Sequence, residues 1–393
     1  MENVYITSAV RTPVGSFQGG LSSLTAPQLG AIAIKEAVTR SQIKPEDVQE
    51  CIMGEVLTAG VGQAPARQSA ILSGLPTSVA CLTINKVCGS GLKAVMLGAD
   101  SIKLNADQIV VAGGQEAMSQ APHLMENSRV GYRMGSVALV DSMIKDGLWD
   151  PFNNWHMGNA GELCAKEHHF TREAQDEFAI DSYKKAQKAQ ENSLFKNEIV
   201  AVTIAGKKES LLIEKDEEPG NAKFEKMAAL KPAFDKQGTI TAANASKLND
   251  GASAVILMSE SQFKKRNIKP LAKIVSYSSF AQDPKWFTTA PVGAIKKALQ
   301  QAQLSVKDID FWEINEAFSV VTMIAIKELQ IPAERVNPHG GAVALGHPIG
   351  ASGARLLTTL THALHTHKKK YGLATLCIGG GEAVAMIIER MEQ

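Results

Sequence analysis

Two cysteines and a histidine stand in glycine-rich settings that suit covalent chemistry. The first cysteine, Cys88, lies in NKVCGSGLKAV (Asn85 to Val95), directly before Gly-Ser-Gly and a helix-like apolar pattern. It is either a small buried hydrophobe beside close-packing glycines or a thiol whose charged form is favoured by a helix N-terminus. This stretch alone leaves both interpretations open.

The histidine, His347, lies in NPHGGAVALGHPIGASGARLL, just before a helical pattern that matches the one after Cys88. Equivalent elements of a duplicated chain can meet at a shared axis, so we expect Cys88 and His347 to face each other. A neutral imidazole can then take the thiol proton and produce the nucleophile that acyl transfer needs.

The second cysteine, Cys377, ends the strand-like run ATLC and precedes IGGGEA. A strand end followed by three glycines exposes backbone N–H groups, which suits an oxyanion site, although a buried strand cysteine is often inert. In WEINEAFS, Asn315 and Glu316 stand where a strand gives way to a helix. Asn315 can orient a water or a carbonyl, whereas Glu316 can equally be a helix-start residue.

Two further histidine-containing stretches have competing interpretations. DGLWDPFNNWHMGNAGE places His156 and Met157 in an aromatic loop, where they either contact a substrate or fill the core. HALHTHKKK holds His362, His365 and His367 with a spacing that resembles a metal motif. We interpret it as the cationic end of a helix and predict no metal site.

The composition is that of a globular protein of two or three domains, with 393 residues and 45% hydrophobic side chains. The 41 basic and 40 acidic residues leave no general field for nucleic acid or a membrane surface. Five scattered cysteines without C-x-x-C argue against a disulfide framework. With no leader pattern and no run of 18 apolar residues, we predict a cytoplasmic protein without a membrane or nucleic-acid partner.

The chain also repeats itself. AIKEAVTRSQIKPEDVQECIMGEV (33–56) aligns without a gap on AIKKALQQAQLSVKDIDFWEINEA (294–317), and both copies have the pattern helix, turn, strand. GSGLKAV at Gly89 matches ASGARLL at Ala351 with nearly the same offset. Each copy alternates apolar β-rich runs with helical patterns, which predicts two similar α/β halves.

A third match pairs GGQEAM at Gly113 with GGGEAV at Gly379, and it requires a slip of four residues near 365–370. Between the copies, residues 120–249 have no counterpart. This segment contains a capped amphipathic helix, TREAQDEFAIDSYKKAQKAQ, and a charged, turn-rich strip, and we interpret it as an insertion in the first half.

Over essentially its whole length the sequence resembles the thiolases, and among them the short-chain acetyl-CoA acetyltransferases. The resemblance rests on NKVCGSGLKAV, VVAGGQEAMS, HMG, TAANASKLNDGA, WEINEAF, GGAVALGHPIGASGAR and LCIGGGEA. It implies a five-layered α/β/α/β/α fold of two duplicated halves with an inserted loop domain. The corresponding domains are 1–119 with 250–270, the insertion 120–249, and 271–393. A homotetramer, a dimer of dimers, is also implied.

The same resemblance implies roles for five residues. Cys88 would be the acylated nucleophile, His347 the base that activates it, and Cys377 the acid/base that moves the substrate α-proton. Asn315 would hold a water that forms one oxyanion hole together with His347. The backbone N–H groups of Cys88 and Gly379 would form the other.

Further residues are implied to bind coenzyme A (CoA), which is a substrate and product rather than a cofactor. Ser246 resembles the family's pantetheine contact, and Met157 the residue that confines the acyl pocket. The residues that resemble the tunnel lining are Leu148, His156, Ala317 and Phe318. A lysine-rich part of the insertion, with Lys207, Lys208, Lys223 and Lys226, is expected either to meet nucleotide phosphates or to be a solvated surface.

The implied enzyme is an acyltransferase of lipid metabolism that condenses two acetyl-CoA to acetoacetyl-CoA and CoA, and catalyses the reverse thiolysis. The mechanism would be ping-pong through an acetyl-Cys88 thioester. Three alternatives stay open: a 3-ketoacyl-CoA thiolase of broader chain length in fatty-acid degradation, a Cys-His hydrolase, and a non-catalytic acyl-CoA carrier. A Cys-His hydrolase does not need a second thiol, so a catalytic requirement for Cys377 distinguishes a thiolase from a hydrolase.

Overall fold

The computed structural model describes residues 2–206 and 209–392, and in this part of the chain ten strands form one mixed sheet. Nine of them follow one another from edge to edge: β14 (Phe311–Ile314), β15 (Tyr371–Ile378), β16 (Glu382–Arg390), β13 (Ala272–Ala281), β1 (Val4–Arg11), β12 (Asn249–Ser259), β5 (Ile109–Ala117), β3 (Glu50–Gly54) and β4 (Ala80–Ile84). The tenth, β2 (Gly15–Ser16), pairs with β12.

The sheet consists of two halves with the same strand order. The order β1-β12-β5-β3 recurs as β13-β16-β15-β14, and in both halves the first two pairings are antiparallel and the third is parallel. The halves join where β1 meets β13, through two residue pairs, Tyr5 with Lys273 and Ile6 with Ala272. The predicted duplication is therefore confirmed at the level of topology.

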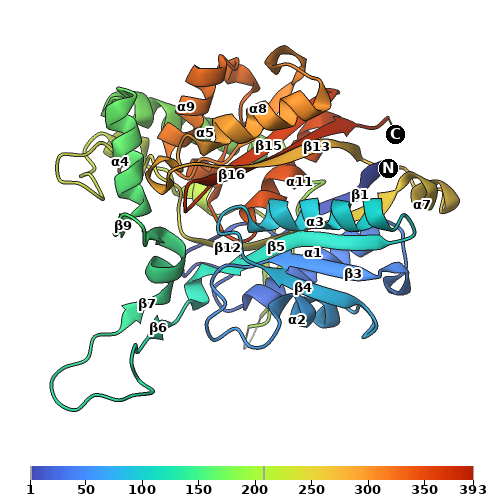
Figure 1. The fold of residues 1–393 in the computed structure, drawn as a ribbon, viewed down its shortest axis with the longest axis horizontal. Helices are drawn as coiled ribbons and strands as arrows, with labels where there is room; N and C mark the ends of the chain where they lie inside the picture. The colour runs from blue at the N-terminus through green and yellow to red at the C-terminus, as the bar shows by residue number, and fades with distance from the viewer. Residues whose placement is uncertain (1, 207–208, 393) are drawn as a thin grey trace.

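Helices cover both outer faces and fill the space between the half-sheets. They are α1 (Ala26–Arg40), α2 (Pro65–Leu72), α3 (Ser90–Leu104), α8 (Ala290–Ala302), α9 (Ser319–Leu329) and α11 (Ser352–Thr366). Figure 1 shows α3 and α11 in the middle, α1 and α2 on one outside and α8 and α9 on the other. A buried apolar cluster joins α3, α11 and both half-sheets. This arrangement is the predicted five-layered fold.

The two central helices approach each other closely because glycines line their contact. A Cβ atom on Gly353 of α11 would lie 2.3 Å from the Leu92 backbone N, and one on Gly91 of α3 would lie 2.7 Å from the Ala354 backbone N. Side chains larger than hydrogen do not fit at such distances. The glycines after Cys88 and His347 therefore bring the N-terminal ends of α3 and α11 together.

Two of the three repeat matches are confirmed, and the third is wrong. The helix, turn and strand of 33–56 correspond to those of 294–317, and α3 corresponds to α11. However, β5 begins five residues after α3 ends and β15 begins five residues after α11 ends, so no slip occurs at 365–370. GGQEAM therefore lies at the end of β5, whereas GGGEAV forms the turn from β15 into β16.

The segment 120–249 packs beside this core. It contains α4 (Met157–Glu167), α5 (Arg172–Glu191), α6 (Phe224–Met227) and three hairpins, which are β6 (His123–Leu124) with β7 (Val140–Asp141), β8 (Trp149–Asp150) with β9 (Trp155–His156), and β10 (Val202–Ile204) with β11 (Leu211–Ile213). The predicted amphipathic helix is α5, whose first turn is capped by Thr171 Oγ1 accepting from Ala174 N at 3.2 Å. The exact domain boundaries stay a prediction.

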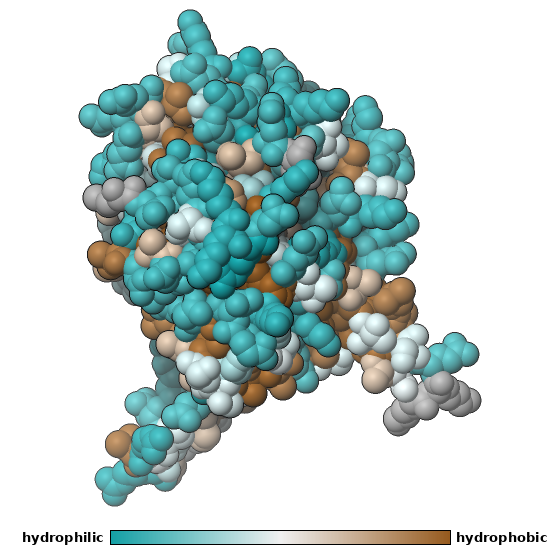
Figure 2. Space-filling view, turned by 90° about the vertical axis from the view of Figure 1, so that its right-hand side faces the viewer, coloured by the Kyte–Doolittle hydropathy of each residue, from teal (hydrophilic) through white to brown (hydrophobic). Residues whose placement is uncertain are grey.

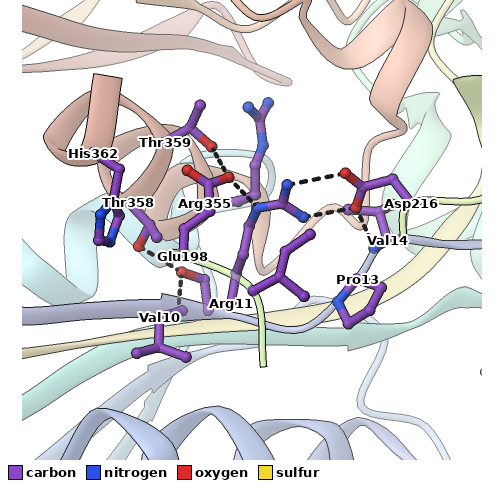
Figure 3. Close-up of polar contacts among 12 residues, drawn as sticks. Val10, Arg11, Pro13, Val14, Glu198, Asp216, Arg355, Thr358, Thr359 and His362 are labelled. Carbon is purple, nitrogen blue, oxygen red and sulfur yellow. Dashed lines mark hydrogen bonds and ion pairs between the residues drawn. The ribbon is translucent and has the colours of Figure 1, made fainter. Parts of the chain in front are cut away.

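A buried ionic cluster fastens this segment to the core (Figure 3). Arg11, at the end of β1, contacts Glu198 Oε1 at 2.5 Å and Asp216 Oδ1 at 2.6 Å, and Thr359 of α11 donates to Glu198 Oε1 at 3.0 Å. Burial alone lowers the pKa of the Arg11 guanidinium, but the two carboxylates outweigh it and raise the pKa above its ordinary value. The insertion and both halves thus share one charged centre.

Two shorter helices, α7 (Glu260–Lys265) and α10 (Ala342–Leu345), complete the fold. Among the described helices, none is both long and apolar enough to cross a lipid bilayer.

Candidate active site

Cys88 stands in a strained turn between β4 and α3. Val87 has a φ of +45°, a left-handed conformation that is unfavourable for a β-branched residue. The turn is held by Val87 N donating to Asn85 Oδ1 at 2.9 Å and by Ser90 Oγ donating to the Val87 carbonyl at 2.7 Å. Strain of this kind, held in place by local hydrogen bonds, is typical of a turn that presents a nucleophile.

The resting form of Cys88 is the neutral thiol. Burial raises its pKa to about 11, and the charge of Glu116 acts in the same direction. The backbone N–H groups of Gly379 and of Cys88 itself face the sulfur and pull the pKa down, but less strongly. Desolvation thus outweighs the helix terminus, and the thiol needs a base to become reactive.

His347 has the protonation state of such a base. Ser352 Oγ donates to the Pro348 carbonyl at 2.8 Å, so its oxygen is left to accept from His347 Nδ1 at 2.6 Å. This assigns the proton of the neutral ring to Nδ1 and leaves a lone pair on Nε2. Burial lowers the pKa of His347 to about 3, which keeps the ring neutral.

Two asparagines orient His347 further. The His347 backbone N–H donates to Asn249 Oδ1 at 2.9 Å, and Asn315 Nδ2 lies 3.4 Å from His347 Nε2. Asn315 follows β14, where its own N–H donates to the Thr375 carbonyl at 3.0 Å. Its Oδ1 is buried and has no hydrogen-bond partner among the described residues. Asn315 therefore lies next to His347, and its predicted role in holding a water stays a prediction.

Cys377 lies at the end of β15 and is fully buried. Burial raises the pKa of its thiol well above the usual value, and the nearby Cys88 adds to the shift. The proximity has a clear structural cause, because a Cβ on Gly89 would lie 2.4 Å from the Ile378 side chain. The two thiols predicted to cooperate thus belong to one site.

The turn after Cys377 depends on glycine. Gly380 and Gly381 have φ values of +89° and +85°, and a Cβ on Gly381 would lie 2.4 Å from the Gln282 carbonyl. This turn carries the Gly379 N–H to the Cys88 sulfur. Met157 covers the same spot, because a Cβ on Gly379 would be 3.5 Å from the Met157 Cε atom.

A cavity of about 550 Å³ opens beside these groups. Its lining includes four residues predicted to contact CoA together with the predicted base: Leu148, His156, Ser246, Phe318 and His347. Ala317 lies behind this wall, where its carbonyl accepts the Ser246 N–H at 3.0 Å. A second cavity of similar size, between α4 and α8, contains none of the predicted residues.

His156 and Phe318 shape this wall from two elements. Burial lowers the pKa of His156, whose Nδ1 accepts the Gly158 N–H at 3.0 Å at the start of α4. The His156 ring stacks on Phe234 with 4.7 Å between centroids, and Phe234 meets Phe318 edge to face at 5.8 Å. His156 is thus both a helix cap and part of an aromatic wall.

The remaining predicted groups lie elsewhere. Lys223 and Lys226 are exposed near α6, and Lys207 and Lys208 lie outside the described residues, so their predicted phosphate contacts stay a prediction. His362 and His365 each face a backbone carbonyl, of Ala9 and of Leu271, while His367 faces His339. The described residues contain no group of three metal-ligating side chains.

Sequence reasoning did not predict that Glu116 ties the two halves together near Cys88. Its carboxylate accepts the N–H groups of Val56 and Leu57 at 3.1 Å each and of Gly350 at 2.8 Å. Burial raises the pKa of Glu116 to about 7, although these three hydrogen bonds oppose the shift. The only indication in the sequence was a Gln-Glu pair near the end of a predicted strand. The hydrogen-bond partners of Glu116 lie up to 234 residues away along the chain, so no local pattern specifies them.

The third repeat match, of GGQEAM with GGGEAV, pairs Glu116 with Glu382, and this pairing is wrong as well. Glu382 begins β16 and forms an ion pair with Lys86, two residues before Cys88. It is partly exposed, unlike Glu116, so the two glutamates have different surroundings.

Comparison with known proteins identifies the family of this chain. The family model described as "Thiolase, N-terminal domain" matches residues 4–261, and "Thiolase, C-terminal domain" matches residues 268–390. The chain belongs to the thiolase family. This thiolase is 52% identical over 391 residues to the cytosolic acetyl-CoA acetyltransferase ERG10 of Gibberella zeae, covering 99% of this chain and 98% of that protein. It is 53% identical over 392 residues to an acetyl-CoA acetyltransferase of Cupriavidus necator, covering 99% and 100%.

A solved structure agrees over the same length. The crystal structure of the Acat5 thiolase from Ascaris suum in complex with coenzyme A matches this thiolase with a TM-score of 0.95. The two are 46% identical in sequence, and the match covers 99% of this chain and 100% of the other. The two relatives are named acetyl-CoA acetyltransferases, and the solved structure is a thiolase with bound coenzyme A. This thiolase is therefore an acyltransferase.

Proposed function

We propose that this thiolase is an acetyl-CoA C-acetyltransferase that forms acetoacetyl-CoA from two acetyl-CoA and catalyses the reverse thiolysis. The observation that carries the proposal is the neutral Nε2 of His347 in a site with the half-buried Cys88 thiol, the buried Cys377 thiol and the N–H of Gly379. The names of the curated relatives support the acetyl group as the unit transferred.

In the first half-reaction, His347 Nε2 takes the Cys88 proton, and the sulfur attacks the thioester carbon of acetyl-CoA. The oxyanion of the tetrahedral intermediate accepts hydrogen bonds from the backbone N–H groups of Cys88 and Gly379, which already face this sulfur. The C–S bond to CoA breaks, and the CoA sulfur takes the proton of Cys377. The products are acetyl-Cys88, protonated His347 and a Cys377 thiolate.

In the second half-reaction, the Cys377 thiolate removes an α-proton from a second acetyl-CoA. The enolate oxygen is stabilised by protonated His347 and by a water held by Asn315, whose buried Oδ1 has no protein partner in the described chain. The enolate carbon attacks acetyl-Cys88, and the departing Cys88 sulfur recovers its proton from His347. Each residue thus returns to its starting protonation state.

Thiolysis kinetics test the proposal. We expect turnover of acetoacetyl-CoA with CoA to exceed that of a 3-ketoacyl-CoA with a longer chain, because Met157 covers the acyl end of the site at Gly379. A faster long-chain rate would favour the broader 3-ketoacyl-CoA thiolase. Acetyl-CoA hydrolysis that is unaffected by Cys377→Ser would favour the hydrolase.

We also propose a homotetramer in the cytoplasm. Support for association comes from the arm between β6 and β7, which exposes the apolar side chains Met125, Val130, Met134 and Leu139 and projects from the body of the molecule (Figure 1). Hydrophobic surface also gathers on the lower part of the face in Figure 2. The cytoplasmic location is supported by the name of the Gibberella zeae relative. Light scattering and cell fractionation test the two statements, and a monomer or an organellar location would contradict them.

A further inference from the structure

Lys247 places an ammonium group at the junction of two walls of the substrate cavity. It lies next to Ser246, and both residues line the cavity. Its Nζ donates to the Ala245 carbonyl at 2.7 Å and to the Val343 carbonyl at 3.2 Å, which is 96 residues further along the chain. The same Nζ lies 5.5 Å from the centre of the Tyr183 ring, on α5.

The backbone of Val343 is held by an acidic side chain at its N–H and a basic side chain at its carbonyl. Its N–H donates to Glu316 Oε2 at 3.0 Å, and its carbonyl accepts from Lys247. Glu316 is fixed in turn by Ser182 Oγ and Asn337 Nδ2, each at 2.7 Å. Glu316 was expected to be a helix-start residue of the helix that follows it, which is α9. It interacts instead with the start of α10.

The location of Val343 links this arrangement to the chemistry. Val343 belongs to α10, a single turn whose last carbonyls have no partner within the helix. His347 follows two residues after α10 ends. An ammonium at this C-terminal end satisfies one such carbonyl and interacts favourably with the negative end of the helix dipole.

We propose that Lys247 is a positioning residue whose ammonium holds the cavity wall that carries Ser246 against the segment that leads to His347. The inference rests on the proposed function, because it assigns the Ser246 wall to CoA binding. Burial lowers the pKa of Lys247 to about 8, while Glu218 and Glu316 oppose that shift. A solvated surface lysine would not show such desolvation.

Removing the ammonium affects the two walls differently. His347 keeps its bonds to Asn249 and Ser352, so the base stays in place. The wall at 245–246 loses its cationic link to α10. We therefore expect the loss to fall on substrate binding rather than on turnover.

The test is thiolysis kinetics of Lys247→Met, which keeps the aliphatic stem and removes the charge. Hydrogen bonds to charged groups contribute enough that KM for CoA and acetoacetyl-CoA should rise about tenfold or more, while kcat should change less than about threefold. The matched control is Lys297→Met, because Lys297 also contacts a carbonyl (Ser279, 3.3 Å) and a ring (Phe280, 5.1 Å) but lies outside the cavity lining. It should leave both constants unchanged.

A chemical rescue separates positioning from general structural damage. In Lys247→Ala, methylammonium chloride should restore KM, because the small cation offers N–H donors to the two carbonyls. Tetramethylammonium at equal ionic strength should not, because it has no N–H group. KM does not depend on the folded fraction of a preparation, so partial unfolding of a variant does not affect this comparison. If the neutral variants do not fold at all, Lys247→Arg replaces them in the test, because arginine keeps a cation with N–H donors. Its KM should stay within about threefold of the wild-type value.

Three results would overturn the inference: an unchanged KM in Lys247→Met, equal effects of the two cations on Lys247→Ala, or a KM in Lys247→Arg raised about tenfold. A wild-type protein without thiolysis would instead refute the proposed function. The two failures are therefore distinguishable.

Discussion

Replacing Ser352 with alanine tests the assignment of the proton on His347. Ser352 Oγ accepts a hydrogen bond from His347 Nδ1 at 2.6 Å and donates one to the Pro348 carbonyl at 2.8 Å. Without this oxygen, the buried Nδ1–H has no acceptor, so the ring gains by moving its proton to Nε2. The Nε2–H tautomer cannot take the Cys88 proton, and kcat therefore falls although neither proposed reactive group has changed.

The size of the loss follows from the unpaired group. A buried polar group left without its partner costs about 1–3 kcal/mol. Because the cost applies to the tautomer that reacts, it adds to the activation free energy, which corresponds to a fall in kcat of about 5-fold to 150-fold. KM should change little, since Ser352 does not line the substrate cavity.

The assay is initial-rate thiolysis of acetoacetyl-CoA, together with the melting temperature of each variant. Ser253→Ala is the matched control, because Ser253 is equally buried and makes two hydrogen bonds, to the Val10 carbonyl and to Thr358 Oγ1, each at 2.9 Å. It should lower stability by a similar amount and leave kcat intact. A Ser352→Ala enzyme whose kcat equals that of Ser253→Ala would refute the tautomer assignment.

Further predictions concern other parts of the site and the fold. Replacing Cys377 with alanine should lower kcat for condensation by at least about a hundredfold, the scale of general acid–base catalysis, and steady-state rates near wild type would exclude the role. Because the pKa of His347 is lowered to about 3, the base stays unprotonated as the pH falls from 7 to 5.5, whereas an ordinary histidine would cause about a tenfold loss. A pH–rate profile that falls by this amount would contradict the lowered pKa. Gly353→Ala places a Cβ atom 2.3 Å from the Leu92 backbone N and should cost about 1–3 kcal/mol of unfolding free energy, and an unchanged urea midpoint would show that the helices can separate at no cost. Arg11→Met leaves two buried carboxylates without their cation and should cost about 3–5 kcal/mol, and thermal stability equal to wild type would contradict this.

Much of the fold was predictable because the chain carries two copies of one pattern. The matches of 33–56 and of Gly89 with their counterparts correspond to equivalent helices and strands. They also led to the expectation that Cys88 and His347 belong to one site, since each precedes one of the paired central helices. The glycine run after Cys377 likewise indicated exposed backbone N–H groups, and the Gly379 N–H faces the Cys88 sulfur.

Other features depend on contacts between distant segments that no local pattern specifies. Glu116 meets Gly350 across 234 residues, and Lys247 meets Val343 across 96. The third repeat match failed because similar Gly-Glu-Ala strings occur at the end of one strand and in the turn after another. The protonation state of Cys88 was also not predictable, since burial and the helix terminus shift the pKa of its thiol in opposite directions.

Intact-protein mass spectrometry after mixing with acetyl-CoA tests the central claim most directly. Wild-type protein should gain the mass of one acetyl group, and Cys88→Ala should gain none while keeping its melting temperature. An adduct of equal size on the Cys88→Ala protein, or none on folded wild-type protein, would contradict the role of Cys88 as the acyl carrier.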